Sequence, residues 1–265
     1  MRSAVRVLLV ALILASALVA TNSSAQSLTP CVRTVFFSME PGILSGGVNN
    51  KLAYTAVVTK TFEQKLYDGN TLHWTVQDIQ ARDQGGREMR QHIEGCITDI
   101  DGQQQLRIRT SIYDRAAKTN TSWLTGPGAI GLATISHTQI PSPHPNLADV
   151  PHTPMPREAR PQITTEELGT KTIAGLEATG RRRTEIIPAD AEGNDAPLKS
   201  TTDTWTSVKD HIVLMSVTDN PRMGHYSWEV TTLTFGPPNP ALFTPPADYK
   251  FWDNEPQAVA ASKPQ

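Results

Sequence analysis

The chain has 265 residues, with 24 basic and 26 acidic side chains and a formal net charge of −2. Charges of both signs are interspersed, so there is no electrostatic basis for binding nucleic acid or an anionic membrane surface. The length is sufficient for one large domain with its own hydrophobic core.

The first 25 residues have the pattern of a secretory signal peptide. Arg2 and Arg6 precede an apolar run over residues 7–20 that is too short to span a bilayer, and the small residues Ser23-Ser24-Ala25 follow it. We expect cleavage after Ala25 and a periplasmic or secreted protein that is not transmembrane afterwards. Cleavage removes two arginines and no acidic residue, so the net charge of −2 becomes −4.

The chain contains two cysteines, Cys31 and Cys96. In an oxidising compartment an even pair most simply forms a disulfide, which would attach the irregular N-terminal segment to the strand that contains Cys96. Two buried free thiols are the alternative.

Regular strands are expected from Leu52 onward. In residues 53–64 the side chains of Tyr54, Ala56, Val58 and Phe62 fall on one face, and threonines fall on the other. Similar alternating segments follow over residues 72–76, 87–97, 106–112 and 120–124, with turn residues between them. Four or five strands joined in this way predict an antiparallel meander with one apolar face.

Thr125–Pro161 contains eight prolines and almost no periodicity, so we expect a long crossing loop. It separates two sheet-forming halves of a single domain over residues 26–252. The glycines at 126, 128 and 131 have the spacing of a dinucleotide-binding fingerprint. No βαβ unit surrounds them, so we interpret them as loop glycines. The three histidines at 137, 144 and 152 lack a metal-ligand spacing, so we expect no metal site and no cofactor.

Strands resume at Ile163. The stretch Leu168–Pro188 predicts an extended segment over Thr170–Ile173, a turn at Ala174-Gly175 and a strand over Leu176–Ile187, with glycines where the backbone turns or is closely approached. Further strands are expected over residues 198–208, 210–218 and 225–236.

The strand over residues 225–236 changes its parity part-way. Tyr226, Trp228 and Val230 share one face, whereas Leu233 and Phe235 fall on the other, which predicts a β-bulge near residues 231–232. A bulge bends a sheet and gives it a concave side. After one helical turn over residues 239–243, the packing anchors are expected to be Phe243, Tyr249 and Trp252, followed by a disordered tail over residues 253–265.

At this point the sequence carries a resemblance. GTKTIAGLEATGRRRTEIIP, and then HIVLMSVTDNPRMGHYSWEVTTLTFGPPNPALFTPPADY, resemble uncharacterised secreted bacterial proteins with the patterns LGxxxIxGxxAxGxR, SDPRxG and PDPxLFxxPxxY. The layout is also similar, more distantly, to the periplasmic lipoprotein-carrier (LolA-like) superfamily. The match covers about Leu52 to Tyr249 and is stronger after Thr125.

This resemblance implies a mainly β fold with minor α: a curved antiparallel sheet or unclosed half-barrel. It also implies binding of acyl chains or envelope components, and it brings no catalytic residues. The chain departs from the superfamily because it has scarcely any amphipathic helix to fill the hollow.

The candidate ligand-binding residues are aromatic and basic. Trp74, Trp205, Tyr226 and Trp228 are candidates for lining a groove, although packing in the core accounts for most aromatic residues of this kind. Of the three consecutive arginines, two fall on one face of their strand. A solvent-facing strand is the favoured interpretation, and the alternative is that Arg181 or Arg183 forms a rim for a carboxylate or phosphate.

Three classes of function remain open from the sequence. The first is a non-catalytic binding protein for an acyl-chain-like or other apolar envelope ligand, such as a lipid or lipoprotein. The second is a structural module that docks an envelope protein. The third, a hydrolase, has Asp210, His211, Asp219 and His225 near one hairpin but neither a GxSxG nor an HExxH motif.

Overall fold

The computed structural model describes residues 52–98, 100–137 and 160–254. This part of the chain forms twelve strands and one short 3-10 helix. Their bounds are β1 Tyr54–Lys65, β2 Thr71–Arg82, β3 Glu88–Thr98, β4 Gln104–Asp114, β5 Thr119–Thr125, β6 Leu132–His137, β7 Gln162–Ile173, β8 Leu176–Ile187, β9 Leu198–Ser207, β10 Val213–Asn220, β11 Gly224–Phe235, η3 Pro240–Phe243 and β12 Lys250–Asn254.

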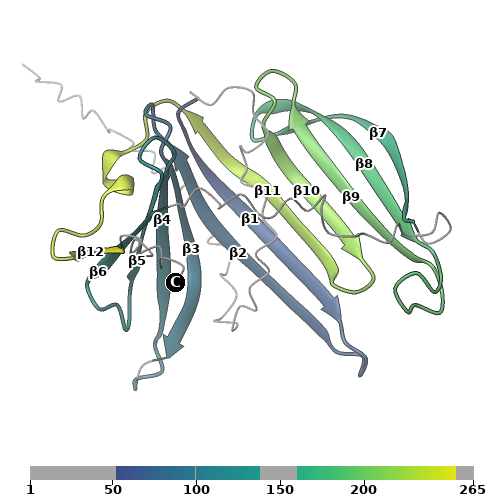
Figure 1. Cartoon of the computed structure of the whole chain (residues 1–265), viewed down its shortest axis with the longest axis horizontal. Coiled ribbons are helices and arrows are strands. Elements are labelled where there is room, and N and C mark those ends of the chain that lie inside the picture. Colours follow the sequence, from purple (N-terminus) through teal and green to yellow (C-terminus); the bar gives the residue numbers. More distant parts are fainter. Residues whose placement is uncertain (1–51, 99, 138–159, 255–265) are drawn as a thin grey trace, which may run out of the picture.

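All twelve strands belong to one curved sheet that does not close (Figure 1). Its order is β12-β6-β5-β4-β3-β2-β1-β11-β10-β9-β8-β7. The two halves of the chain are therefore two meanders that meet where β1 pairs with β11, and every pairing is antiparallel except that of β12 with β6. The expected mainly β, curved and unclosed sheet is confirmed.

The central strand β1 shows why the sheet has two distinct faces. Its buried positions alternate from Tyr54 to Phe62, as the sequence predicts. We call the face that carries these side chains the inner face. Partners directly opposite in an antiparallel pair share a face, so Trp74 on β2 and Tyr226 on β11, both opposite Phe62, also belong to it.

Among the described residues, the hydrophobic core forms two clusters. The first lies around β1, β10 and β11 and includes Val58, Leu214 and Val230. The second lies on the opposite face of the first meander, where Phe243 of η3 covers buried residues. These are Ala81, Met89, Ile112, Trp123 and Ala133.

The C-terminal segment is anchored as expected at two of three positions. Asn239 caps η3 by accepting a hydrogen bond from the Ala241 amide at 3.0 Å, which places Phe243 in the second cluster. The Tyr249 hydroxyl donates to the Leu124 carbonyl at 2.6 Å. The expectation for Trp252 is wrong: its side chain is exposed on β12.

The bulge predicted in β11 is confirmed. Val57 lies opposite Thr232 and Val58 opposite Val230, so Thr231 is the extra residue. Further register shifts occur in the β3–β4, β7–β8 and β9–β10 pairings. Because each bulge adds local twist, four of them agree with the curvature of the sheet.

Two strands contradict the sequence-based boundaries. β6 lies inside the expected loop at 125–161, and β12 extends two residues into the expected tail at 253–265. β6 has six residues and lies between β5 and β12, and β12 is a five-residue edge strand whose partner β6 is distant in the chain. So few residues give too little alternation to detect.

Several expectations lie outside the described residues. They are the signal peptide over residues 1–25, the part of the loop over residues 138–159 and the tail beyond residue 254. Cys31 also lies there, so its pairing with Cys96 on β3 stays a prediction, as does the single domain over residues 26–252. In the described ranges, no helix has the length and apolar character needed to cross a bilayer.

Candidate functional site

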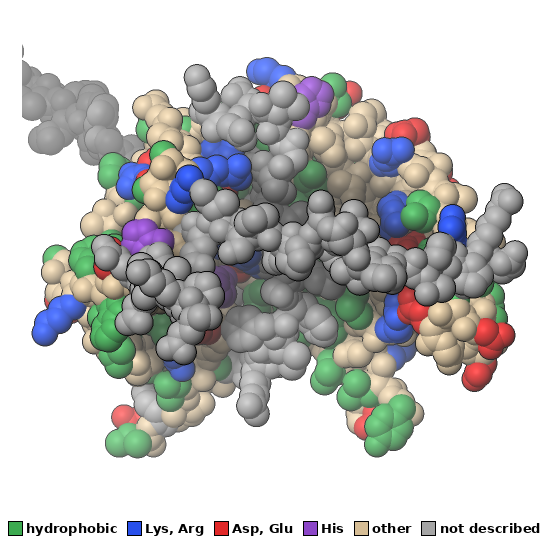
Figure 2. Space-filling model, viewed as in Figure 1, with side chains coloured by type: hydrophobic (Ala, Val, Ile, Leu, Met, Phe, Trp, Pro, Cys, Tyr) green, Lys and Arg blue, Asp and Glu red, His purple; other side chains and the backbone are tan. Residues whose placement is uncertain are grey.

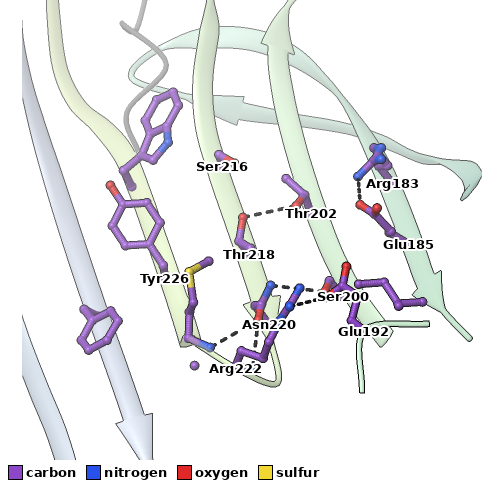
Figure 3. Close-up of a pocket in the computed structure, with 15 residues that line it drawn as sticks. Arg183, Glu185, Glu192, Ser200, Thr202, Ser216, Thr218, Asn220, Arg222 and Tyr226 are labelled. Carbon is purple, nitrogen blue, oxygen red and sulfur yellow. Dashed lines mark hydrogen bonds and ion pairs between the residues drawn. The ribbon is translucent and has the colours of Figure 1, made fainter. Parts of the chain in front are cut away.

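A pocket of 440 Å³ lies on the inner face of the second meander (Figure 3). Strands β1, β8, β9, β10 and β11 line it, together with the connections at one end of these strands. Its lining divides into an aromatic wall, a floor of hydroxyl groups and a charged rim.

The aromatic wall consists of Phe62, Tyr226 and Trp228. Phe62 also stacks on Trp74, with ring centroids 5.3 Å apart and an interplanar angle of 22°. Phe62 and Trp228 are only 4% and 3% exposed, so most of each ring packs against protein and little of it borders the pocket. The wall is therefore rigid and apolar.

The floor is formed by alternate residues of β9 and β10. Thr202 lies directly opposite Thr218, and their hydroxyl oxygens are 3.3 Å apart. Asn220 donates through Nδ2 to Ser200 Oγ at 3.3 Å. Ser216 completes this row next to Trp228, so the floor offers both hydrogen-bond donors and acceptors.

Two ion pairs form the rim. Arg183 donates to Glu185 at 2.7 Å, and Arg222 donates to Glu192 at 2.6 Å. All four side chains are partly exposed. Exposed pairs of this kind contribute only about 0–1 kcal/mol, so a ligand anion could replace either glutamate at little cost.

A second set of charges lies on the inner face of the first meander. Asp78 binds both Lys60 and Arg90, Glu88 binds both Arg82 and Arg115, and Glu94 binds both Arg107 and Arg109. Each of these three carboxylates is thus shared between two cations.

Burial controls the protonation of this charged set. It raises the pKa of Asp78 and lowers the pKa of Lys60, and in both cases it outweighs the attraction between the two groups. Burial, with Arg90, Lys60 and Arg109 nearby, lowers the pKa of His92 to about 4. His92 is therefore neutral at pH 7.

Tyr226 links the charged set to the pocket. Burial, followed by the nearby Asp78, raises the pKa of Tyr226 to about 12, so the phenol stays protonated at pH 7. Its hydroxyl is buried and has no hydrogen-bond partner among the described residues. A ligand that reached this hydroxyl would find a donor ready to be used.

The four acid–base candidates do not come together. His225 and Asp219 form a pair at 2.8 Å near the β10–β11 turn. Asp210 and His211 lie in the β9–β10 turn at the opposite end of β10, where the Asp210 amide donates to Ser207 Oγ at 3.0 Å. Among the described residues there is no group of three or more potential metal ligands.

The structure brings three of the six predicted ligand residues to the pocket: Arg183, Tyr226 and Trp228. Trp74 lies behind Phe62. Arg181 does not line the pocket and is 67% exposed, with Glu167 at 3.9 Å.

Trp205 belongs to the opposite face of the sheet. Its register partners are Gly180 and Met215, whereas its neighbour Thr204 pairs with Ser216 of the floor. The Nζ atom of Lys171 lies 4.1 Å from the centre of its ring. Trp205 and Trp228 therefore do not share a hollow.

The hydroxyl floor and the second ion pair of the rim were not predicted from the sequence. The alternate Ser and Thr residues of STTDTWTS, residues 200–207, were a visible signal. From the sequence, these residues indicated only a polar face of the strand, because the pairing of β9 with the polar residues of β10 was not known.

No protein-family profile and no curated protein matches the chain. Among solved structures, the MucA/MucB complex of Pseudomonas aeruginosa matches over 76% of this chain and 58% of that chain, with 13% identity and a TM-score of 0.32. An uncharacterized conserved protein from Thermus thermophilus matches over 77% and 91%, with 10% identity and a TM-score of 0.37. The lipoprotein LppX of Mycobacterium tuberculosis matches over 71% and 88%, with 15% identity and a TM-score of 0.28.

At these identities and TM-scores, the matches carry no argument about the superfamily, ligand or partner of this chain.

Proposed function

We propose that the chain is an exported, non-catalytic binding protein whose pocket holds one amphipathic ligand. An acyl-chain-like or other apolar part of the ligand would lie against the aromatic wall, with its polar head at the rim of Arg183 and Arg222. The supporting observation is the pocket of 440 Å³ whose lining changes from aromatic to hydroxyl to charged across one face. Its volume falls within the usual range for small-molecule sites.

The size of the apolar part sets the expected strength of binding. Each methylene removed from water contributes about 0.8 kcal/mol, so about six to eight of them give roughly 5–6 kcal/mol before the cost of association. Binding should therefore be reversible, as a carrier requires. The hydroxyl floor makes a purely hydrocarbon ligand less suitable, because burying those hydroxyl groups against methylenes costs free energy.

The rim provides the contact for the head group. A carboxylate or phosphate can accept two parallel hydrogen bonds from an arginine, which Glu185 and Glu192 now accept. Exchanging one exposed carboxylate for another costs little, so the rim favours acidic heads without binding them tightly.

The test is a titration of the chain lacking residues 1–25 with dodecanoate, and with dodecanol as the ligand without an acidic head. Tryptophan fluorescence should change saturably, because Trp228 borders the pocket. Ser216→Leu fills the floor and should weaken both ligands about ten-fold or more. Arg183→Gln should weaken dodecanoate but not dodecanol.

Arg181→Gln is the matched control, since Arg181 is on the same strand and face but outside the pocket. Its binding should equal that of the unmodified chain. The absence of any saturable change, or equal losses for Arg181→Gln and Arg183→Gln, would exclude this use of the pocket.

A second candidate function is an interaction module without a small ligand. The low exposure of Phe62 and Trp228 favours it, because rings already covered by protein leave less apolar surface for a ligand. This candidate predicts that Ser216→Leu leaves all binding behaviour unchanged while a protein partner still co-purifies.

A further inference from the structure

One end of the sheet carries hydrophobic side chains on separate loop tips. Because the strands of the first meander alternate in direction, the β1–β2, β3–β4 and β5–β6 connections all lie at the same end. Tyr67, Ile100 and Ile130 occupy these three connections, with exposed fractions of 104%, 102% and 83%. Figure 2 shows hydrophobic side chains at the tips of two hairpins along the lower edge of the molecule.

Turn formation does not explain the side chain of Tyr67. In the β1–β2 turn the Asn70 amide donates to Asp68 Oδ1 at 2.9 Å, and the Leu66 amide donates to the Asn70 carbonyl at 2.7 Å. Asp68, Gly69 and Asn70 thus supply the turn chemistry, and any polar residue would serve at position 67. A fully exposed tyrosine there gains nothing from the fold.

The opposite end of the sheet differs. Among the described residues, the exposed large hydrophobic side chains at this end are Tyr113, Val208 and Phe235, with exposed fractions between 36% and 46%. Each lies at a strand end and is more than half covered. Single exposed apolar residues are common on proteins, but three nearly complete exposures in the connections at one end of the sheet are not explained by that tendency.

We infer that the end bearing Tyr67, Ile100 and Ile130 docks onto a lipid bilayer, with these side chains entering its interfacial layer. Three separate tips suit a fluid surface, which yields around each tip, better than a protein partner, which needs one contiguous surface. Tyrosine is favoured at membrane interfaces because its ring is apolar and its hydroxyl remains hydrated.

The charges beside the tips specify the kind of membrane. Lys65 lies next to the first tip, but Asp68 and Asp101 give the tips a small excess of negative charge. Anionic lipids attract clusters of basic residues, which these tips lack. The surface therefore fits zwitterionic lipid.

The pocket lies at the same end of the molecule. β11 begins where β1 ends, so the β10–β11 turn, with Arg222 and Met223, shares this end with the tips. Docking would bring the rim of the pocket to the lipid surface. The inference about the tips holds whatever the pocket binds.

Flotation of the chain lacking residues 1–25 with phosphatidylcholine vesicles tests the inference. The unmodified protein should float with the vesicles. The partition coefficient of the combined variant Tyr67→Ser, Ile100→Ser, Ile130→Ser should be lower by about ten-fold or more. The matched control Tyr113→Ser, Val208→Ser, Phe235→Ser changes three exposed hydrophobic residues at the other end and should float like the unmodified protein.

Circular dichroism and thermal unfolding establish that both variants are folded, and the dodecanoate titration separates a defect of the tips from a defect of the pocket. Failure of the unmodified chain to float, equal flotation of the tip variant, or an equal loss in the control overturns the inference. Flotation that requires anionic lipid overturns it as well.

Discussion

Gly180 on β8 allows a close approach that no other residue permits. Trp205 lies directly opposite it, and a Cβ atom added at position 180 would lie 2.6–2.7 Å from three carbons of the indole ring. Carbon atoms normally rest about 3.5–4.0 Å apart, so Gly180→Ala would force the ring to move by about 1 Å. Moving the ring would also disturb its contact with Lys171, whose Nζ atom lies 4.1 Å from the ring centre.

Two opposing effects determine how much Gly180→Ala changes the free energy of unfolding. Overpacking of this kind typically costs about 1–3 kcal/mol. Replacing glycine by alanine within a strand returns about 0.5–1 kcal/mol, because the unfolded chain loses conformational freedom. Overpacking wins, so Gly180→Ala should lower the free energy of unfolding by about 0.5–2 kcal/mol and the melting temperature by roughly 2–6 °C.

Urea and thermal unfolding of four variants test this reasoning. Gly180→Ala should be neutral or stabilising when Trp205→Leu is also present, because the obstacle is gone. Gly95→Ala is the matched control: it is a strand glycine with nothing within 4 Å of the added Cβ, so it should stabilise. If Gly180→Ala destabilises equally with and without Trp205, the close approach does not explain this glycine.

The remaining predictions concern buried charge, pH and the cysteines. Asp78→Ala should lower the free energy of unfolding by about 3–5 kcal/mol because Lys60 loses its carboxylate partner at a buried site, whereas Lys60→Met with Asp78→Leu should cost much less in the same urea experiment. The unfolded chain protonates His92 near its ordinary pKa of 6.5 and the folded chain only near about 4, so stability should fall as the pH drops through that interval, and His92→Gln should flatten this part of the curve. A disulfide between Cys31 and Cys96 should stabilise by about 4 kcal/mol, and recovery of both thiols alkylated in non-reducing peptide mapping would contradict it.

Local residue patterns were sufficient to predict long strands such as Leu176–Ile187 from the sequence. The strand over Leu176–Ile187 has the predicted bounds, and the turn before it holds Ala174 and Gly175 at φ values of 47° and 79°. The bulge at Thr231 was visible as a change of parity within one strand. These features depend on residues only a few positions apart, so a single sequence contains them.

Features that depend on distant partners were not predictable. Thr59 and Thr231 contact each other although 172 positions separate them in the chain, and no residue pattern in either segment indicates that the two strands pair. Trp205 shows the consequence for the candidate site. The face of the sheet on which Trp205 lies, relative to Trp228, depends on the register between β9 and β10. This register shifts between Val213 and Met215. Alternation within β9 alone therefore could not show that the two tryptophans lie on opposite faces.

The pairing of β1 with β11 also explains why the pocket escaped prediction as a unit. Phe62 of the wall comes from the first meander, whereas Tyr226, the hydroxyl floor and the rim come from the second. Neither meander contains the complete lining, so the pocket exists only because the two meanders share one sheet. The same junction brings the buried hydroxyl of Tyr226 near Asp78 and Arg90 of the first meander. A ligand in this pocket that contacts both Phe62 and Tyr226 would contact both halves of the chain and stabilise their junction by mass action.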